Sequence, residues 1–230
     1  MEIPEKKRQY WVVGVILFFW ARAIVLNVWF QEDSIALVTT AHGLFRTAAL
    51  YGSINLAVLL GFWYWSGGKL PELGWKWEGF KKHLGIGCLF GLAMLLQHYL
   101  LTGPLFRALI PSTENPGVNM AILFSNWADL PIWILLAIFK GGFEEELWRS
   151  FEINAFKRLF GKGGLVIALI IGSAIFGLQH VYQGWDTVAS TGFDGLLYGL
   201  IYLRKRSVVE AMAAHAVFDI ISILAGYLLI

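Results

Sequence analysis

The sequence predicts an all-α membrane protein, a bundle of transmembrane helices around an intramembrane cavity. Apolar residues make up 57% of the 230 residues and charged residues only 15%, whereas an ordinary soluble domain has roughly 45–50% and about 25%. Apolar runs of about 20 residues, the length that crosses a bilayer, recur along the chain. The net charge of +2 is too small to favour nucleic-acid binding. We therefore expect residues 1–230 to form a single integral membrane domain whose main partner is the lipid bilayer.

Seven apolar segments are predicted to cross the membrane. They cover residues 10–30, 44–65, 83–102, 129 to at least 140, 165–181, 187–203 and 208–230. The polar stretch 103–127 is expected to be an outer loop, or to hold a short or re-entrant helix that would raise the number to eight. No small-residue cleavage site follows the first segment, so we expect it to be retained rather than removed as a signal peptide.

Basic residues fall in alternate loops of this arrangement. They are dense before the first segment and in the loops that follow the second, fourth and sixth segments. Because basic loops stay in the cytoplasm, this pattern predicts a cytoplasmic N-terminus and a C-terminus on the other side.

Small residues in these segments are expected to serve packing. Gly87 with Gly91, and Gly195 with Gly199, are spaced as in helices that approach each other closely. The single cysteine, Cys88, cannot form an intramolecular disulfide and is expected to be a buried thiol.

Three of the predicted segments carry polar residues that are costly inside a membrane and by default mark function or a structural ion pair. The groups are Glu144-Glu145-Glu146, His180, and His215 with Asp219. Five other polar residues receive no catalytic assignment. Three are histidines without an acidic partner at helical spacing. The other two are an arginine and a lysine, which can pair with acids or reach the membrane interface. These residues are His42, His83, His98, Arg22 and Lys140.

Helical spacing predicts how the site residues face. Residues four apart share one face of a helix, so Glu145 is predicted to pair with Arg149, which leaves Glu144 free to face other helices. By the same rule His215 and Asp219 lie on one face. A carboxylate, an imidazole and an imidazole–carboxylate pair are the groups needed to activate water and to polarise a carbonyl.

The depths of Glu144 and His180 agree only if the fourth segment is longer than its apolar part. Helical periodicity without Pro or Gly continues to Phe160, and glycines follow from Gly161. At about 1.5 Å per residue, a helix that turns there places Glu144 and His180 at roughly 25 Å and 25–28 Å from the turn. We therefore predict one helix that passes through the glutamates to about Phe160 and then turns at Gly161, Gly163 and Gly164.

At these residues the sequence resembles the CPBP family, the CAAX proteases and bacteriocin-processing enzymes also called the Abi family. Its motifs EExxxR, FxxxH and HxxxN or HxxxD occur in order within residues 129–230, as Glu144-Glu145 with Arg149, Phe176 with His180, and His215 with Asp219. The resemblance implies a helical membrane protein that hydrolyses peptide bonds, in some members next to a prenylated cysteine. It also implies that Glu144 and His180 activate water, that His215 and Asp219 stabilise the oxyanion, and that Glu145 and Arg149 support them.

Two features depart from the family pattern. Asp219 stands where Asn is found in the CAAX proteases, and an ionised Asp cannot donate a hydrogen bond to an oxyanion. Asp219 would have to be protonated, orient His215 or bind metal. Trp148 and Ser150 replace the frequent Phe and Gly, which predicts a narrower cavity and an altered substrate choice.

A cofactor is left open by the sequence. The family is also described as metalloproteases, and Glu144, His180 and His215 would satisfy the ligand number of a catalytic zinc site. A metal-free mechanism uses the same residues.

We therefore expect a CAAX-protease-like intramembrane endopeptidase or metalloendopeptidase, acting on a membrane-associated or lipidated peptide. With this resemblance we expect it in the plasma membrane of a prokaryote. The alternatives are a non-proteolytic scaffold or bacteriocin-immunity-type protein, and a proton-coupled transporter, which the absence of an inverted repeat disfavours. Substrate and oligomeric state are not predicted.

Overall fold

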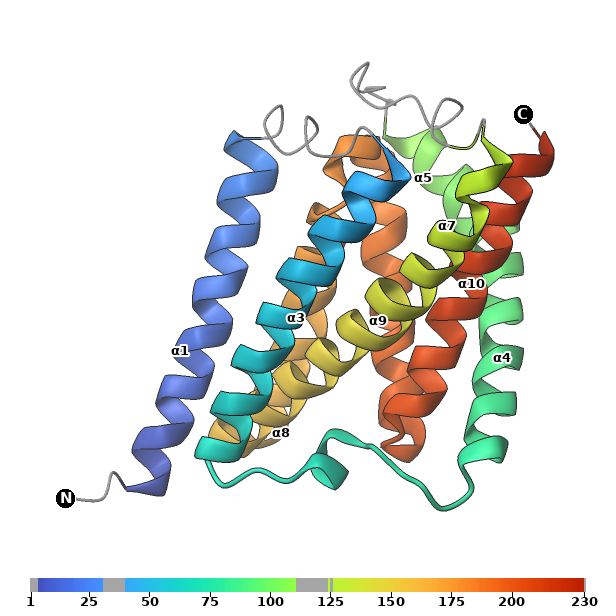
Figure 1. Cartoon of the computed structure of the whole chain (residues 1–230). Helices are drawn as coiled ribbons and strands as arrows, with labels where there is room; N and C mark the ends of the chain where they lie inside the picture. Colours follow the sequence, from blue (N-terminus) through green and yellow to red (C-terminus); the bar gives the residue numbers. More distant parts are fainter. Residues whose placement is uncertain (1–3, 31–39, 111–123, 125, 230) are drawn as a thin grey trace.

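The computed structural model describes residues 4–30, 40–110, 124 and 126–229, and in these ranges it contains helices and turns but no strand. The all-α class is confirmed. The N- and C-termini lie at opposite ends of the bundle (Figure 1). The elements, in chain order, are α1 (Glu5–Ile24), η1 (Val25–Trp29), α3 (Ala41–Trp65), η2 (Leu70–Leu73), α4 (Phe80–Gln97), η3 (His98–Thr102), α5 (Gly103–Leu109), η4 (Trp127–Asp129), α7 (Leu130–Leu136), η5 (Ala137–Glu145), α8 (Glu146–Leu178), η6 (Val181–Gln183), α9 (Trp185–Lys205) and α10 (Val208–Leu229).

By length and hydropathy, five helices in the described part of the chain could cross a membrane. They are Glu5–Trp29, Ala41–Trp65, Phe80–Leu109, Trp127–Leu178 and Val208–Leu229. The predicted fourth and fifth spans both fall in the single 52-residue helix Trp127–Leu178. The predicted sixth span corresponds to α9, whose hydropathy is too low for it to count among these five helices. An integral membrane protein is thus supported, while the number seven and the orientation of the ends stay predictions.

The predicted continuation of the fourth segment is confirmed. Helix α8 runs without a break past Arg149, and its one non-helical residue is Gly161, with φ 65° and ψ −143°. Residues other than glycine rarely adopt this backbone conformation. The chain reverses there, so that the second half of α8 runs back through the bundle (Figure 1).

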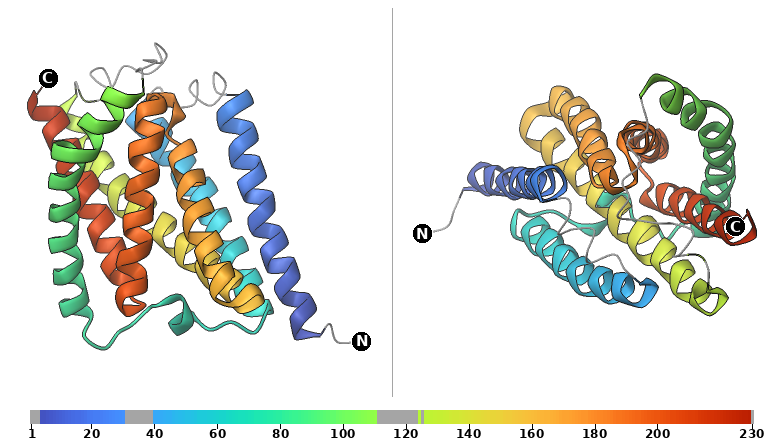
Figure 2. Two further views of the ribbon diagram at one scale, coloured as in Figure 1. Left: turned by 180° about the vertical axis from the view of Figure 1, so that it is seen from behind. Right: turned by 90° about the horizontal axis from the view of Figure 1, so that it is seen from above.

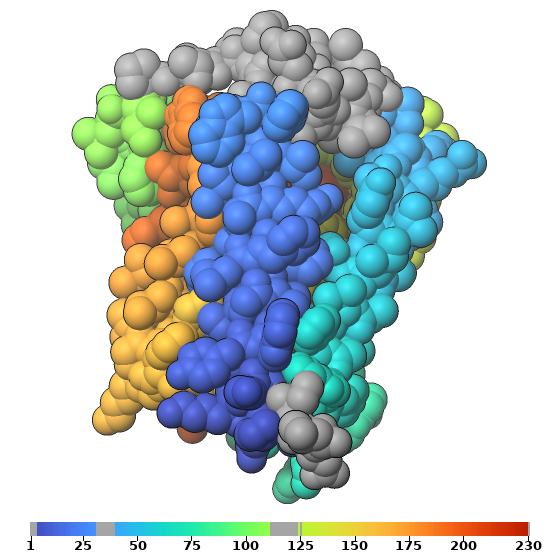
Figure 3. Space-filling model, turned by 90° about the vertical axis from the view of Figure 1, so that its left-hand side faces the viewer, coloured from blue at the N-terminus to red at the C-terminus, as the bar shows by residue number. Residues whose placement is uncertain are grey.

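The long helix α7–η5–α8 passes obliquely through the middle of the bundle, with α3 on one side and α9 and α10 on the other (Figure 2). Helix α1 covers the face between α3 and α8 (Figure 3). Its Ile16 and Trp20 are buried against them. The site described below therefore lies on a central helix with neighbours on every side.

The predicted packing glycines lie at helix contacts. A Cβ on Gly87 would lie 2.5 Å from the Glu210 carbonyl oxygen, and one on Gly91 2.6 Å from that of Ala214, so α4 packs closely on α10. Gly195 likewise approaches the Phe176 ring from α9, and Gly199 approaches a leucine of α8. The packing prediction is confirmed.

The outer segment 103–127 begins with α5 and ends at η4. The short helix predicted as one alternative is α5, which continues the helix of α4 and η3. Residues 111–123 and 125 of the predicted loop lie outside the described residues.

Candidate active site

A cavity of about 600 Å³ lies among α3, η5, α8, α9 and α10. Its wall includes the predicted site residues Glu144, Glu145, His180, His215 and Asp219. The helix that reverses at Gly161 brings the glutamates and His180 to the same cavity, as the depth argument predicts.

Two glycines bring α10 against the glutamate-bearing helix. A Cβ on Gly141 would collide with the Asp219 carboxylate and lie 3.3 Å from His215 Nε2. A Cβ on Gly142 would lie 3.0 Å from the Met212 carbonyl oxygen of α10. Any larger residue would therefore push His215 and Asp219 away from the glutamates.

The glutamates lie on a π-helix. Segment η5, from Ala137 to Glu145, is π-helical and ends where α8 begins. π-Helical turns are rare and frequently occur at functional sites. Their wider turn changes the direction of each side chain relative to α-helical spacing.

Lys140 bridges the first two glutamates. Its Nζ lies 3.1 Å from Glu144 Oε1 and 3.3 Å from Glu145 Oε1. Asn55 of α3 also donates to Glu144 Oε1, at 3.2 Å. Glu144 is thus held on the α3 side of the helix, whereas Glu145 extends to within 3.8 Å of His215 Nε2. One cation therefore pairs with both carboxylates.

The predicted ion pair of Arg149 with Glu145 is wrong, because Arg149 pairs with Glu146. Arg149 Nε lies 3.1 Å from Glu146 Oε2, and both side chains are buried. The α-helix resumes at Glu146, so this pair has the i, i+3 spacing that shares a face. Glu145, still in the π-helical turn, points elsewhere. Glu146 Oε1 also lies 2.9 Å from His215 Nδ1, which places a buried carboxylate directly behind the imidazole.

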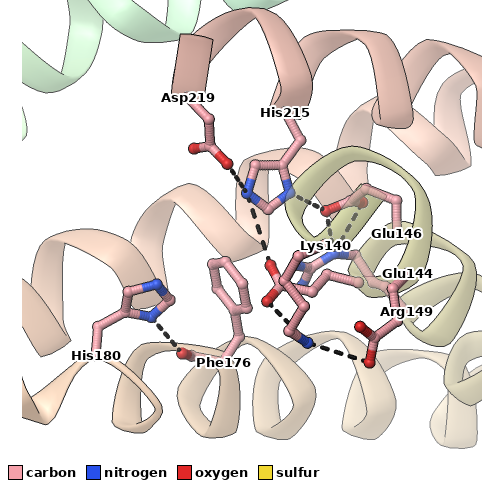
Figure 4. A network of polar contacts seen from close by, with 9 residues as sticks. Lys140, Glu144, Glu146, Arg149, Phe176, His180, His215 and Asp219 are labelled. Atoms are coloured by element: carbon pink, nitrogen blue, oxygen red, sulfur yellow. Dashed lines mark hydrogen bonds and ion pairs between the residues drawn. The ribbon is translucent and has the colours of Figure 1, made fainter. Parts of the chain in front are cut away.

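His215 and Asp219 share a face of α10, as predicted. His215 Nε2 lies 3.6 Å from Asp219 Oδ2, and the ring is buried (Figure 4). With Nδ1 directed at Glu146, the nitrogen that faces the cavity is Nε2. Asp219 therefore lies beside the His215 nitrogen that is not directed at Glu146.

His180 lies on the other side of Phe176 from His215 (Figure 4). The two imidazole centroids lie 5.1 Å and 5.7 Å from the Phe176 ring centroid. His180 Nδ1 lies 3.0 Å from the Phe176 carbonyl oxygen, to which it donates, so Nε2 is the nitrogen that can accept a proton. Within the described residues, no hydrogen bond or ion pair joins His180 to Glu144, His215 or Asp219. All four residues border the cavity.

The comparison with family models finds one similarity, and it covers these residues. The model of the family described as "Type II CAAX prenyl endopeptidase Rce1-like" matches residues 126–221. Residues 126–221 of this chain are therefore similar to the CAAX protease family. The matched segment contains all three motifs, from the glutamates of η5 to Asp219 of α10. No curated protein and no solved structure gives a significant match.

A metal does not fit this candidate site as it is arranged. In the described part of the chain, no three His, Cys, Asp or Glu side chains are close enough to hold one ion. Glu144 is held by Lys140 and Asn55, and His215 Nδ1 faces Glu146. We therefore derive no step through a metal.

Several functional neighbours were missed by the sequence. Lys140 precedes Glu144 by one helical turn, a spacing that could have predicted the pair, but the partners of Glu146 could not be read from spacing. The unassigned histidines also have acidic partners, all from other helices. These pairs are His42 with Asp129 at 3.5 Å, His83 with Glu210 at 2.7 Å and His98 with Asp194 at 2.6 Å.

Trp148 and Ser150, which depart from the family pattern on either side of Arg149, do not border the 600 Å³ cavity. Trp148 Nε1 donates to Glu152 Oε1 at 2.6 Å, and Trp20 Nε1 of α1 donates to the same oxygen at 2.6 Å. Ser150 is buried and donates to the Leu147 carbonyl oxygen. Trp148 instead lines a smaller pocket of about 100 Å³ next to Glu144 and Glu145. The predicted narrowing thus has no counterpart in the main cavity, and an effect on substrate choice stays a prediction.

Proposed function

We propose that this protein is an intramembrane endopeptidase that cleaves a membrane-associated peptide, of which prenylated CAAX-type peptides are the first candidates. The observation that carries the proposal is one cavity of about 600 Å³ whose wall includes Glu144, Glu145, His180, His215 and Asp219. Such a set is expensive inside a membrane and has the acid, base and donor groups that peptide hydrolysis requires.

The glutamates and His180 would activate water. The family motif favours Glu144 as the proton acceptor, and His180 Nε2 would orient the water from the opposite wall. The water oxygen attacks the carbonyl carbon while its proton passes to the carboxylate. The C=O electron pair moves to oxygen and forms a tetrahedral intermediate.

Collapse of this intermediate would complete the reaction. The carboxyl group returns its proton to the amide nitrogen, the C–N bond breaks, and the products are a carboxylic acid and a free amine. Lys140 keeps Glu144 and Glu145 in place throughout, since it contacts both.

As an imidazolium, which donates from Nδ1 to the Glu146 carboxylate and keeps a second N–H at Nε2, His215 would polarise the scissile carbonyl. Its ring is fixed by Glu146 at Nδ1 and lies near Asp219 at Nε2, so its orientation is set before substrate arrives. Preorganised donors of this kind supply a large share of catalysis in many hydrolases. In this assignment Asp219 orients His215 and does not itself contact the oxyanion.

The cavity also has an apolar part that suits a lipidated or apolar peptide. Trp133, Leu136, Phe124 and Ile223 border it, on the side formed by α7 and α10. A substrate anchored in the bilayer would bring its apolar group to this wall and its peptide bond to the polar one.

The test is cleavage by purified, reconstituted protein, compared with Glu144→Gln. Matched prenylated and unprenylated peptides are incubated with each, and products are identified by mass spectrometry. We expect cleavage by the wild type, a loss of at least about 10²-fold in Glu144→Gln, and wild-type rates in Glu78→Gln, a change at an exposed glutamate.

Two results would change this assignment. Cleavage that survives in Glu144→Gln would remove Glu144 from the mechanism. Equal peptide binding by both proteins without cleavage by either would favour the non-proteolytic scaffold.

A further inference from the structure

Tyr198 of α9 borders the same cavity, and its buried hydroxyl has no hydrogen-bond partner within the described residues. The side chain is 1% exposed, and within the described residues no hydrogen bond is made by its hydroxyl. Buried hydroxyls are nearly always hydrogen-bonded to protein, water or ligand. A group bound in the cavity is therefore the natural partner of this hydroxyl.

The Tyr198 ring lies directly on His215. The two ring centroids are 4.3 Å apart and the planes differ by 16°, and both residues border the cavity. The Arg149 guanidinium lies 5.9 Å from the Tyr198 centroid. The phenol is therefore fixed by its neighbours, as a preorganised donor must be.

The presence of Asp219 in place of Asn leaves room for a second hydrogen-bond donor. The resemblance implies an Asn beside the oxyanion-stabilising histidine, and an amide donates where an ionised carboxylate only accepts. Asp219 lies 3.6 Å from His215 Nε2, so α10 supplies a single donor to the carbonyl oxygen. A phenol, with an ordinary pKa of about 10, keeps its proton at neutral pH and can donate.

We propose that the Tyr198 hydroxyl is the second hydrogen-bond donor to the carbonyl oxygen of the scissile bond, beside His215. This inference rests on the proposed function. As the carbonyl carbon becomes tetrahedral, the oxygen gains negative charge and both hydrogen bonds strengthen. Tyr198 would then do what the family's Asn does, from α9 instead of α10.

The test is Tyr198→Phe, which removes one oxygen and keeps the ring that packs on His215. We expect kcat to fall by about 10²-fold, the size seen when one oxyanion donor is removed, with KM within about twofold. Affinity for a peptide phosphinate, a stable tetrahedral mimic, should fall by a similar factor. Affinity for the uncleaved peptide, measured in a Glu144→Gln background, should not change.

The matched control is Tyr202→Phe. Tyr202 lies one turn further along α9, and its hydroxyl accepts from Asn154 Nδ2 at 2.6 Å, outside the cavity. Tyr202→Phe removes a phenol oxygen from α9, as Tyr198→Phe does, and we expect its kcat to stay within about twofold of the wild type. Thermal unfolding of both variants shows that the fold is retained.

The outcomes separate this inference from the proposed function. Full activity of Tyr198→Phe, beside an inactive Glu144→Gln, would overturn the role of Tyr198 and leave the protease intact. Equal losses of affinity for peptide and phosphinate would overturn it too, because they would indicate a role in binding alone. A wild type that cleaves no peptide would overturn both.

Discussion

His215 Nδ1 lies 2.9 Å from Glu146 Oε1, so the third glutamate of the triplet holds the imidazole that faces the cavity. The same carboxylate binds Arg149, 3.1 Å away. Glu146 thus joins α8 to α10 and couples the first motif to the third.

Removal of Glu146 alone should destabilise the protein strongly. Glu146→Leu leaves Arg149 charged, buried and unpaired, and breaking a buried ion pair in this way typically costs about 3–5 kcal/mol. The double variant Glu146→Leu/Arg149→Met removes both charges and should recover much of this free energy of unfolding, but not activity, because His215 still lacks its acceptor. Thermal unfolding and peptide cleavage check the two parts. Equal instability of the single and double variants would show that the pair is not the cause.

Lys140 should be needed for activity. Lys140→Met leaves the Glu144 and Glu145 carboxylates side by side without their shared cation, and we expect a loss of at least about 10-fold in kcat. Lys140→Arg should retain more activity because it keeps the charge. Lys162→Met, an exposed lysine, is the control. Wild-type kcat in Lys140→Met would contradict the bridging role.

Gly141 should tolerate no side chain. In Gly141→Ala the new Cβ meets the Asp219 carboxylate and lies 3.3 Å from His215 Nε2, so both side chains must shift. A displacement near 1 Å can cost about 10²-fold in rate, which steady-state cleavage assays would detect. Gly163→Ala is the matched control, since a Cβ there has no neighbour within 4 Å. If both variants cleave at the wild-type rate, the close approach of α10 has no catalytic importance.

Chelation should leave activity unchanged. Glu144, His180 and His215 do not converge on one point, and no other group of three ligands does so in the described residues. We expect cleavage rates within about twofold after treatment with 1,10-phenanthroline, whereas a zinc site with three protein ligands would lose activity. Loss of activity that added zinc restores would show that the site rearranges to bind metal.

Much of the fold was predictable because its causes are local. Apolar runs identify helices that suit a membrane, and glycine is required at residue 161 because the backbone there has φ 65°. Helical spacing placed His215 and Asp219 on one face of α10, which the structure confirms. The length of the helix after Glu144 followed from periodicity and the absence of Pro and Gly.

The prediction from the sequence was wrong where the backbone departs from α-helical geometry. The i, i+4 rule pairs Arg149 with Glu145 only if the helix is α-helical throughout. The π-helical turn of η5 changes the directions of Glu144 and Glu145, and Glu146 becomes the partner. The π-helical segment packs closely on α10 at Gly141 and Gly142, and residue spacing alone does not reveal a π-helix.

By itself, therefore, the sequence determined the helical membrane class, the three motifs and which residues share a helix face, because these depend on hydropathy and on neighbours within one turn. Only the tertiary structure decided which side chains meet across helices, such as His98 with Asp194 and Tyr198 with His215. Those contacts join residues far apart in the chain, and helix packing sets the distances between them.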